Sequence, residues 1–93
     1  MEQKKTGVDI IADERRSQME DYGWSVEHDI EVNQNGELAL AAIAYAKPNK
    51  SGGVEPEFPW HEDWWKPSPD DRIKELAKAG ALIAAEIDRL LAL

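Results

Sequence analysis

The chain has 93 residues, 42% of them hydrophobic, so it can form one domain over residues 1–93 but not two separate cores. Nineteen acidic against eleven basic residues give a net charge of −8. This charge argues against duplex nucleic acid and anionic membranes as partners, because both are bound through clustered Lys and Arg. With no cysteine, disulfides and zinc–thiolate sites are excluded. No apolar run is long enough for a membrane span or a signal-peptide core, so we expect a soluble, cytoplasmic protein.

A first helix is expected at residues 7–22. Its apolar residues recur at spacings of three and four, which trace one helical face: Val8, Ile11, Ala12, Met19 and Tyr22. Thr6 or Asp9 can cap this helix, and Gly23 can end it. The first six residues, before the helix, are expected to be frayed.

The next segment divides into an irregular part and a second helix. Residues 24–35 show no sustained period, and we expect only a short extended piece there. The second helix is predicted at residues 36–46, with Asn35 as its cap and Pro48 closing it. Because this helix is apolar on every side except at Glu37, it must be buried all round. Two partner helices cannot bury it in so short a chain, so the sequence predicts a homo-oligomer.

Residues 47–68 form a long loop that holds four of the five prolines and three of the four tryptophans. Its first part, residues 49–57, is expected to be flexible. Its second part, residues 58–67, is rich in aromatic side chains and braced by proline near both ends. A loop of this length without regular structure is usually functional or disordered, and the aromatic residues argue against disorder.

The third helix is expected at residues 69–91, with Ser68 as N-cap and Pro69 in the first helical position. Its main apolar stripe consists of Ile73, Leu76, Gly80, Ile83, Ala84, Ile87 and Leu91. A second stripe beside it consists of Glu75, Ala79, Leu82 and Glu86. The predicted fold is therefore all-α: three helices, with a long Trp- and Pro-rich loop between the second and the third.

The aromatic part of the loop is the first candidate ligand site. Trp60 and Trp64 are four residues apart and would share a face of a short helical turn. Together with Trp65 they can form a stacking wall for a flat ligand, with Lys66 and Lys50 placed for a phosphate. The alternative is a structural lid over the groove between the second and third helices, since small domains rely on aromatic side chains for core area.

Arg15 and the histidines are further candidates. Arg15 lies near the middle of the apolar face of the first helix, and a buried guanidinium needs a partner. That partner is either an internal carboxylate, such as Glu37 or Glu86, or a ligand phosphate, unless the head of the side chain reaches solvent at the edge. His28 and His61 are each followed by acids, but their spacing matches no established metal motif. We count His61 with the ligand-binding residues, and hydrogen-bonded structural roles are the alternative.

Three carboxylates from the three predicted helices form a candidate magnesium site. Glu14, Glu37 and Glu86 could converge on a divalent cation, which prefers oxygen ligands. The alternative is that all three are ordinary acids on solvated helix flanks, in which case no cofactor is expected. No residue is assigned a catalytic role.

Several short sequence motifs within residues 10–91 resemble those of a group of small proteins from phages and prophages. They are Glu14-Arg15-Arg16 with Gln18, Gly23-Trp24, Glu27-His28-Asp29, Gly36-Glu37-Leu38-Ala39, Trp64-Trp65-Lys66-Pro67, and Lys78-Ala79-Gly80-Ala81-Leu82-Ile83 with Glu86-Ile87. The resemblance implies a phage accessory protein that acts in the host cytoplasm. More distantly, the chain resembles the MazG-type all-α nucleotide pyrophosphohydrolases, which hold magnesium with Glu-x-x-Glu and Glu-x-x-Asp pairs on adjacent helices. This chain departs from that pattern, because its second helix offers Glu37 alone.

Three functions follow, and the carboxylate pattern discriminates between the first two. We favour a protein that binds a nucleotide-like host molecule without catalysis, in the manner of a counter-defence sponge. One alternative is a magnesium-dependent nucleotide pyrophosphohydrolase of MazG-like type, which would need paired acids within one helical turn. The other is a structural or host-protein-binding accessory protein.

Overall fold

The computed structural model describes residues 4–48, 50 and 52–93. These residues form four α-helices, which are α1 (Gly7–Tyr22), α2 (Val26–Val32), α3 (Glu37–Ala46) and α4 (Arg72–Leu91), and one 3-10 turn, η1 (Glu62–Trp64). The all-α prediction is confirmed, with one helix more than expected. Within the described part of the chain, no helix is both long and apolar enough to cross a membrane.

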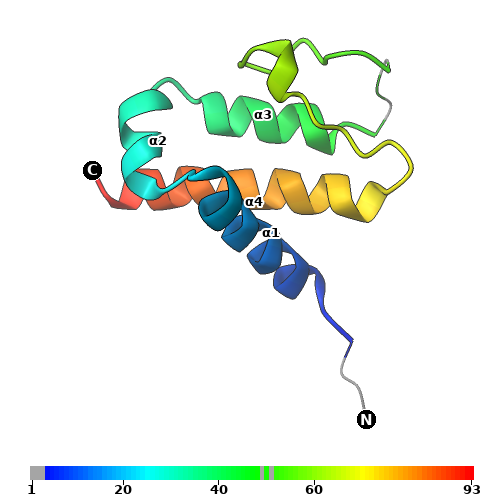
Figure 1. Ribbon diagram of the computed structural model, residues 1–93, viewed down its shortest axis with the longest axis horizontal. Coiled ribbons are helices and arrows are strands. Elements are labelled where there is room, and N and C mark those ends of the chain that lie inside the picture. Colours follow the sequence, from blue (N-terminus) through cyan, green and yellow to red (C-terminus); the bar gives the residue numbers. More distant parts are fainter. Residues whose placement is uncertain (1–3, 49, 51) are drawn as a thin grey trace.

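Helices α3 and α4 form the scaffold of the molecule. Figure 1 shows them antiparallel and side by side, with α1 crossing α4 at an angle and α2 near the C-terminal end of α4. The loop that carries η1 folds back over α3 (Figure 1). The predicted fraying of residues 1–6 and flexibility of residues 49–57 fall partly on residues 1–3, 49 and 51, which lie outside the described residues.

The core lies between α3, α4 and the aromatic loop. Its buried members are Leu38, Ala41, Ala42, Ala44, Tyr45, Phe58, Ala79, Leu82 and Ala85. The alanines let the two helices approach closely, and the larger side chains fill the space that remains. From the loop, Phe58 packs edge-on to the Tyr45 ring, and Trp65 stacks on it with ring centroids 4.7 Å apart. These contacts fasten the loop to the scaffold.

Helix α1 has the predicted bounds because its caps are local. Thr6 and Asp9 form a reciprocal capping box, in which each side chain accepts a hydrogen bond from the backbone N–H of the other residue. Gly23 ends the helix in the left-handed conformation, with φ at 70°.

The segment after α1 is helical, so the predicted extended piece at residues 24–35 is wrong. Ser25 caps α2 by accepting a hydrogen bond from the backbone N–H of His28 at 3.2 Å. Glu27 and Asp29 lie in the first turn, where carboxylates favour the exposed amides. A seven-residue helix is too short to show an apolar period, and its cap is the stronger sequence signal.

Two predicted helix starts are also corrected. Gly36, with φ at 81°, occupies the N-cap position of α3 in place of Asn35. Helix α4 begins at Arg72 and is capped by Asp71, which accepts from the Lys74 N–H at 3.0 Å. Ser68 lies before the helix, where its N–H donates to Glu75 and its hydroxyl accepts from Lys78.

The apolar stripe of α4 is largely exposed, although its period predicted a core face. Ile83 is 50% exposed, whereas Leu82 of the second stripe is buried. The second stripe faces α3, and its acids are tolerated there because Glu75 and Glu86 are paired with cations. Helix α3 is likewise not buried all round within one chain, since Leu40 and Ile43 remain exposed.

We expect Gly80→Ala to destabilise the protein, although alanine is the better helix former. A Cβ at Gly80 would lie 2.5 Å from Cδ1 and 2.8 Å from Cγ1 of Ile11, where α1 crosses α4. The overpacking should lower the free energy of unfolding by about 1–3 kcal/mol, measured by urea denaturation at one fixed protein concentration. In an Ile11→Ala background the clash disappears, and the same substitution should stabilise by up to about 1 kcal/mol. A loss of equal size in both backgrounds would contradict this packing.

Candidate ligand-binding site

Four aromatic side chains from two parts of the chain wall a cleft, here called the aromatic cleft. Tyr22 and Trp24 come from the end of α1 and the turn after it, and Trp60 and Trp64 come from the loop. The Trp24 ring centroid lies 5.8 Å from that of Trp60 and 6.3 Å from that of Trp64. These walls are shared by two adjoining hollows, of about 360 and 90 Å³. The larger has the size of a small-molecule site.

The larger hollow is supported by a chain of buried hydrogen bonds. The Trp60 indole N–H donates to Asn33 Oδ1 at 3.1 Å. The Asn33 amide donates in turn to Asp29 Oδ1 at 2.9 Å. Asp29 is only 1% exposed, and its second oxygen has no hydrogen-bond partner. The chain connects α2 to the aromatic loop and fixes the plane of the Trp60 ring.

His28 lines the same hollow and is oriented by the buried carboxylate. Its Nδ1 lies 3.3 Å from Asp29 Oδ1, so a proton on Nδ1 is held by that oxygen. In the neutral ring this tautomer leaves Nε2 as the acceptor. The imidazole can therefore take a hydrogen bond from a bound molecule.

The smaller hollow combines the aromatic walls with polar groups from α1 and α4. Besides those walls, its lining consists of Glu14, Gln18, Tyr45, Lys66, Lys78 and Leu82. Gln18 is 4% exposed, and its carbonyl oxygen Oε1 is buried without a hydrogen-bond partner. A buried acceptor of this kind is costly unless something donates to it.

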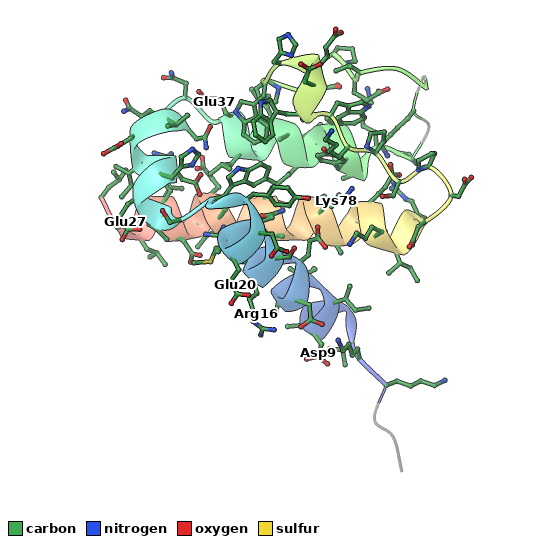
Figure 2. All side chains as sticks on the ribbon, viewed as in Figure 1. Asp9, Arg16, Glu20, Glu27, Glu37 and Lys78 are labelled. Atoms are coloured by element: carbon green, nitrogen blue, oxygen red, sulfur yellow. The ribbon has the colours of Figure 1, made fainter. Side chains whose placement is uncertain are left out.

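Lys78 reaches from α4 toward the loop, and Figure 2 shows its side chain in the space between α4 and α3. Its ammonium donates to the carbonyl of Lys66 and to Ser68 Oγ, and it lies 5.6 Å from the centroid of the Tyr45 ring. Burial lowers the pKa of Lys78, because desolvation disfavours the ammonium. Lys78 will therefore lose its charge at a lower pH than an exposed lysine.

The structure brings together some of the predicted ligand residues and separates others. Trp60 and Trp64 are in the cleft walls, and Lys66 lines the smaller hollow. Trp65 instead packs in the core against Phe58, at a centroid distance of 5.0 Å. Trp65 therefore has the structural role that is the alternative to ligand binding in the sequence analysis.

Of the two alternatives for Arg15, the structure has the buried one, but Arg15 supports the cleft from behind and lines neither hollow. Its guanidinium donates to the carbonyl of Trp24 at 3.1 Å and pairs with Asp88 at 3.5 Å. Neither predicted carboxylate partner is used. Arg15 thus fixes the backbone of one aromatic wall.

His61 lines the larger hollow, and its other contacts are local. It is the N-cap of η1, where its Nδ1 accepts from the Asp63 N–H at 3.1 Å. The ring remains exposed, so it can reach a ligand at the mouth of the cleft.

The three carboxylates predicted to bind magnesium take separate partners. Glu14 pairs with Lys74 at 3.2 Å, and Glu86 pairs with Arg89 at 2.6 Å. Glu37 accepts from the Asn35 N–H at 2.6 Å. Among the described residues, no group of three or more His, Asp or Glu side chains is placed to hold a metal ion, so the predicted convergence is not found there.

Sequence reasoning did not connect the residues of α1 and α4 with the aromatic cleft, and it gave Glu14 a different role. Glu14, Gln18 and Tyr22 are spaced by four, which places them in one row on α1 that leads to Trp24. The spacing of these three residues could have indicated the α1 side of the cleft. The position of Lys78 opposite it depends on how α1 crosses α4, which the sequence does not reveal.

Comparison with known proteins gives no match to any protein-family model, curated protein or solved structure. The resemblances to phage proteins and to MazG-type enzymes therefore stay predictions.

Proposed function

We propose that this chain binds a nucleotide-like molecule in the aromatic cleft without catalysis. The observation that carries the proposal is the buried, unpartnered Oε1 of Gln18, a residue that lines the smaller hollow between aromatic walls. A ligand that donates an N–H to this oxygen would recover a hydrogen bond that the free protein lacks. Exocyclic amino groups of nucleobases are such donors, and glutamine reads the adenine edge with both of its amide atoms.

The aromatic walls favour a flat ligand. Trp64 is 51% exposed, so part of its ring is free for stacking. Each stacked base gains about 1–3 kcal/mol, whatever its identity. Stacking would supply affinity, and the Gln18 amide would supply selectivity.

The phosphate would be held by local basic groups. The net charge of −8 opposes an anion, but Lys66 and Lys78 both line the smaller hollow. Glu14 in the same hollow is paired with Lys74, which reduces its repulsion. The pKa of Lys78 is lowered, so Lys78 loses its charge at a lower pH than an exposed lysine does. As the pH rises, the affinity for the anion should therefore begin to decline at a lower pH than it would if the lysine were exposed.

The resemblance to small phage proteins supports a biological setting for this binding. A phage accessory protein in the host cytoplasm that captures a nucleotide signal would act as a counter-defence sponge. Such a role needs affinity and selectivity only.

Tryptophan fluorescence during nucleotide titration tests the proposal. We expect adenine nucleotides, cyclic dinucleotides included, to change the emission of the wild type. Gln18→Leu should weaken binding by about 1–3 kcal/mol, and Trp64→Ala should do so by a similar amount. Gln34→Leu is the matched control, because Gln34 is exposed in the turn before α3 and should leave affinity unchanged.

Two results would redirect the proposal. If the protein converts a nucleotide when magnesium is added, the MazG-type pyrophosphohydrolase takes its place. If no nucleotide binds at millimolar concentration, with or without magnesium, the cleft is better explained as a protein-binding or structural surface.

A further inference from the structure

The face of α4 that carries its largest aliphatic side chains is uncovered. Its members, all between 45% and 66% exposed, are Ile73, Leu76, Ile83, Ile87 and Leu90. With Gly80 they follow spacings of three, four, three, four and three, which is the repeat of a helix–helix seam. This row is called the α4 seam below.

The apolar surface continues from the α4 seam onto α1. A groove of about 330 Å³ lies between the two helices and is lined by Gly7, Ile10, Ile11, Ile73, Leu76 and Ala77. Five half-exposed aliphatic side chains present on the order of 500 Å² of accessible surface before the groove is added, which is the size of the largest apolar patch on a typical monomer, and such a patch is often functional. A stable dimer covers about 800 Å² on each partner, so the seam and the groove together approach the required area.

We propose that a second copy of this chain covers the α4 seam, with the two α4 helices antiparallel about a twofold axis. The spacing of the seam is the same when read in either direction. An antiparallel pair centred between Ala81 and Leu82 therefore sets Ile73 opposite Leu90 and Leu76 opposite Ile87. Ile83 then lies opposite Gly80, where Ile11 of α1 already packs over the glycine and forms part of the contact surface.

The distribution of charge favours a second copy as the occupant. Two chains of charge −8 repel each other, so their contact surface must be nearly free of unpaired charge. Between Glu75 and Glu86 the only charged residue of α4 is Lys78, whose ammonium is bound to the loop. At the C-terminal end, Glu86 pairs with Arg89 and Asp88 pairs with Arg15.

Sedimentation equilibrium of the full chain tests the assembly. At micromolar to submillimolar concentration we expect a mass of twice the 10.5 kDa of one chain. The double variant Ile83→Glu with Ile87→Glu should sediment as a monomer, because it buries unpaired carboxylates in the seam. Its circular dichroism should stay helical, since both positions are half exposed within one chain. Val54→Glu, at an exposed apolar position in the loop, is the control and should remain dimeric.

Single cysteines test the direction of pairing, and the chain contains no cysteine of its own. In the antiparallel pair, two copies of Ile83→Cys are offset by about 5 Å along the seam, and a short bismaleimide should join them. Two copies of Ile73→Cys are about 25 Å apart and should not be joined.

Three results would overturn the proposal. The first is a wild type that stays monomeric over the whole concentration range. The second is an assembly that the double glutamate variant leaves intact, which would place the contact elsewhere. The third is cross-linking of Ile73→Cys as efficient as that of Ile83→Cys, which would show parallel pairing.

Discussion

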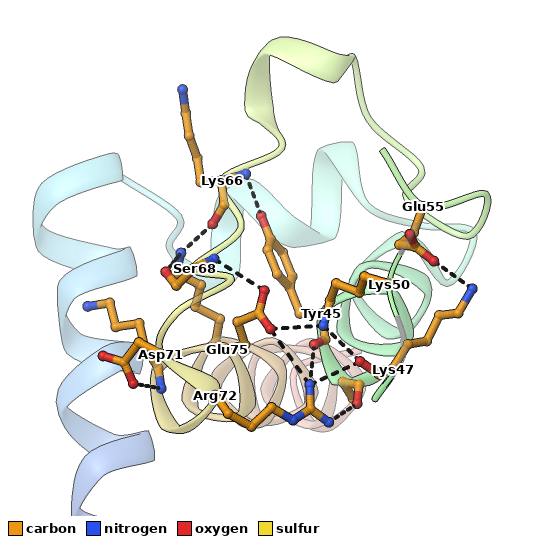
Figure 3. A network of polar contacts seen from close by, with 12 residues as sticks. Tyr45, Lys47, Lys50, Glu55, Lys66, Ser68, Asp71, Arg72 and Glu75 are labelled. Atoms are coloured by element: carbon orange, nitrogen blue, oxygen red, sulfur yellow. Dashed lines mark hydrogen bonds and ion pairs between the residues drawn. The ribbon is translucent and has the colours of Figure 1, made fainter. Parts of the chain in front are cut away.

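Replacing Glu75 with alanine should lower the free energy of unfolding by about 3–5 kcal/mol, a large part of the stability of a small domain. Glu75 is 4% exposed and lies at the centre of the polar network in Figure 3. One carboxylate oxygen pairs with Lys50 at 3.0 Å, and the other accepts from the Ser68 N–H at 3.2 Å. Its removal takes the anionic partner from a mostly buried ammonium, which keeps its hydrogen bond to the Lys47 carbonyl, and leaves the Ser68 N–H without its acceptor.

The control variants separate charge from hydrogen bonding. Glu75→Gln keeps an oxygen that can accept from the Ser68 N–H, so it should lose less stability than the alanine variant. Glu20→Ala removes an acid that points away from the molecule on α1 (Figure 2), and its effect should stay within about 0.5 kcal/mol. Urea denaturation measures all three. A Glu75→Ala loss no greater than that of Glu20→Ala would mean that the network does not hold the loop.

The same network explains why only some helix boundaries were predictable. The caps of α1 lie within its own sequence, so Thr6 and Gly23 could be read directly. The start of α4 depends on contacts beyond its first turn, because Ser68 is bound by Glu75 and Lys78, seven and ten residues further along the chain. Figure 3 also shows Arg72, whose guanidinium donates to the carbonyls of Tyr45, Ala46 and Lys47 at the end of α3. A contact between two helices far apart in the chain leaves no pattern in the local sequence.

Periodicity identified α4 as a helix but not the face that enters the core. The Ile and Leu row has the stronger apolar signal, yet α3 packs on alanines and Leu82, with Glu75 and Arg89 buried beside them. Buried acids look like solvated ones until their partners are known. A row of apolar residues indicates a surface that is buried. The row alone does not show whether the residues that bury it come from the same chain or from another one.

Half of the aromatic cleft was predictable, for a physical reason. Trp60 and Trp64 are close in sequence, so their shared wall followed from spacing and proline bracing. Trp24 joins them through tertiary contacts: its ring packs against Trp60, whose indole N–H donates to Asn33, 27 residues away in sequence. Trp65, next to Trp64, turns into the core instead, since adjacent side chains in an irregular turn point in different directions.

Replacing Asn33 with alanine should lower the free energy of unfolding by about 2–4 kcal/mol, because each buried group left unpaired costs about 1–3 kcal/mol. Asn33 is 3% exposed and is the link between Asp29 and the Trp60 indole. The variant leaves the Trp60 indole N–H without an acceptor. It also removes one donor from the buried Asp29 carboxylate, which keeps its contact with His28. Trp60 should also lose its fixed orientation, and tryptophan emission should shift to longer wavelength.

A double-mutant cycle isolates the contact between α2 and the loop. Trp60→Phe removes the indole N–H while keeping a ring in the wall, so Asn33→Ala should cost less in that background. We expect a coupling of about 1 kcal/mol between the two substitutions, measured by urea denaturation. Additive effects would mean that the indole does not bind Asn33. The Trp60 wall of the cleft would then be held only by ring packing against Trp24 and Phe58.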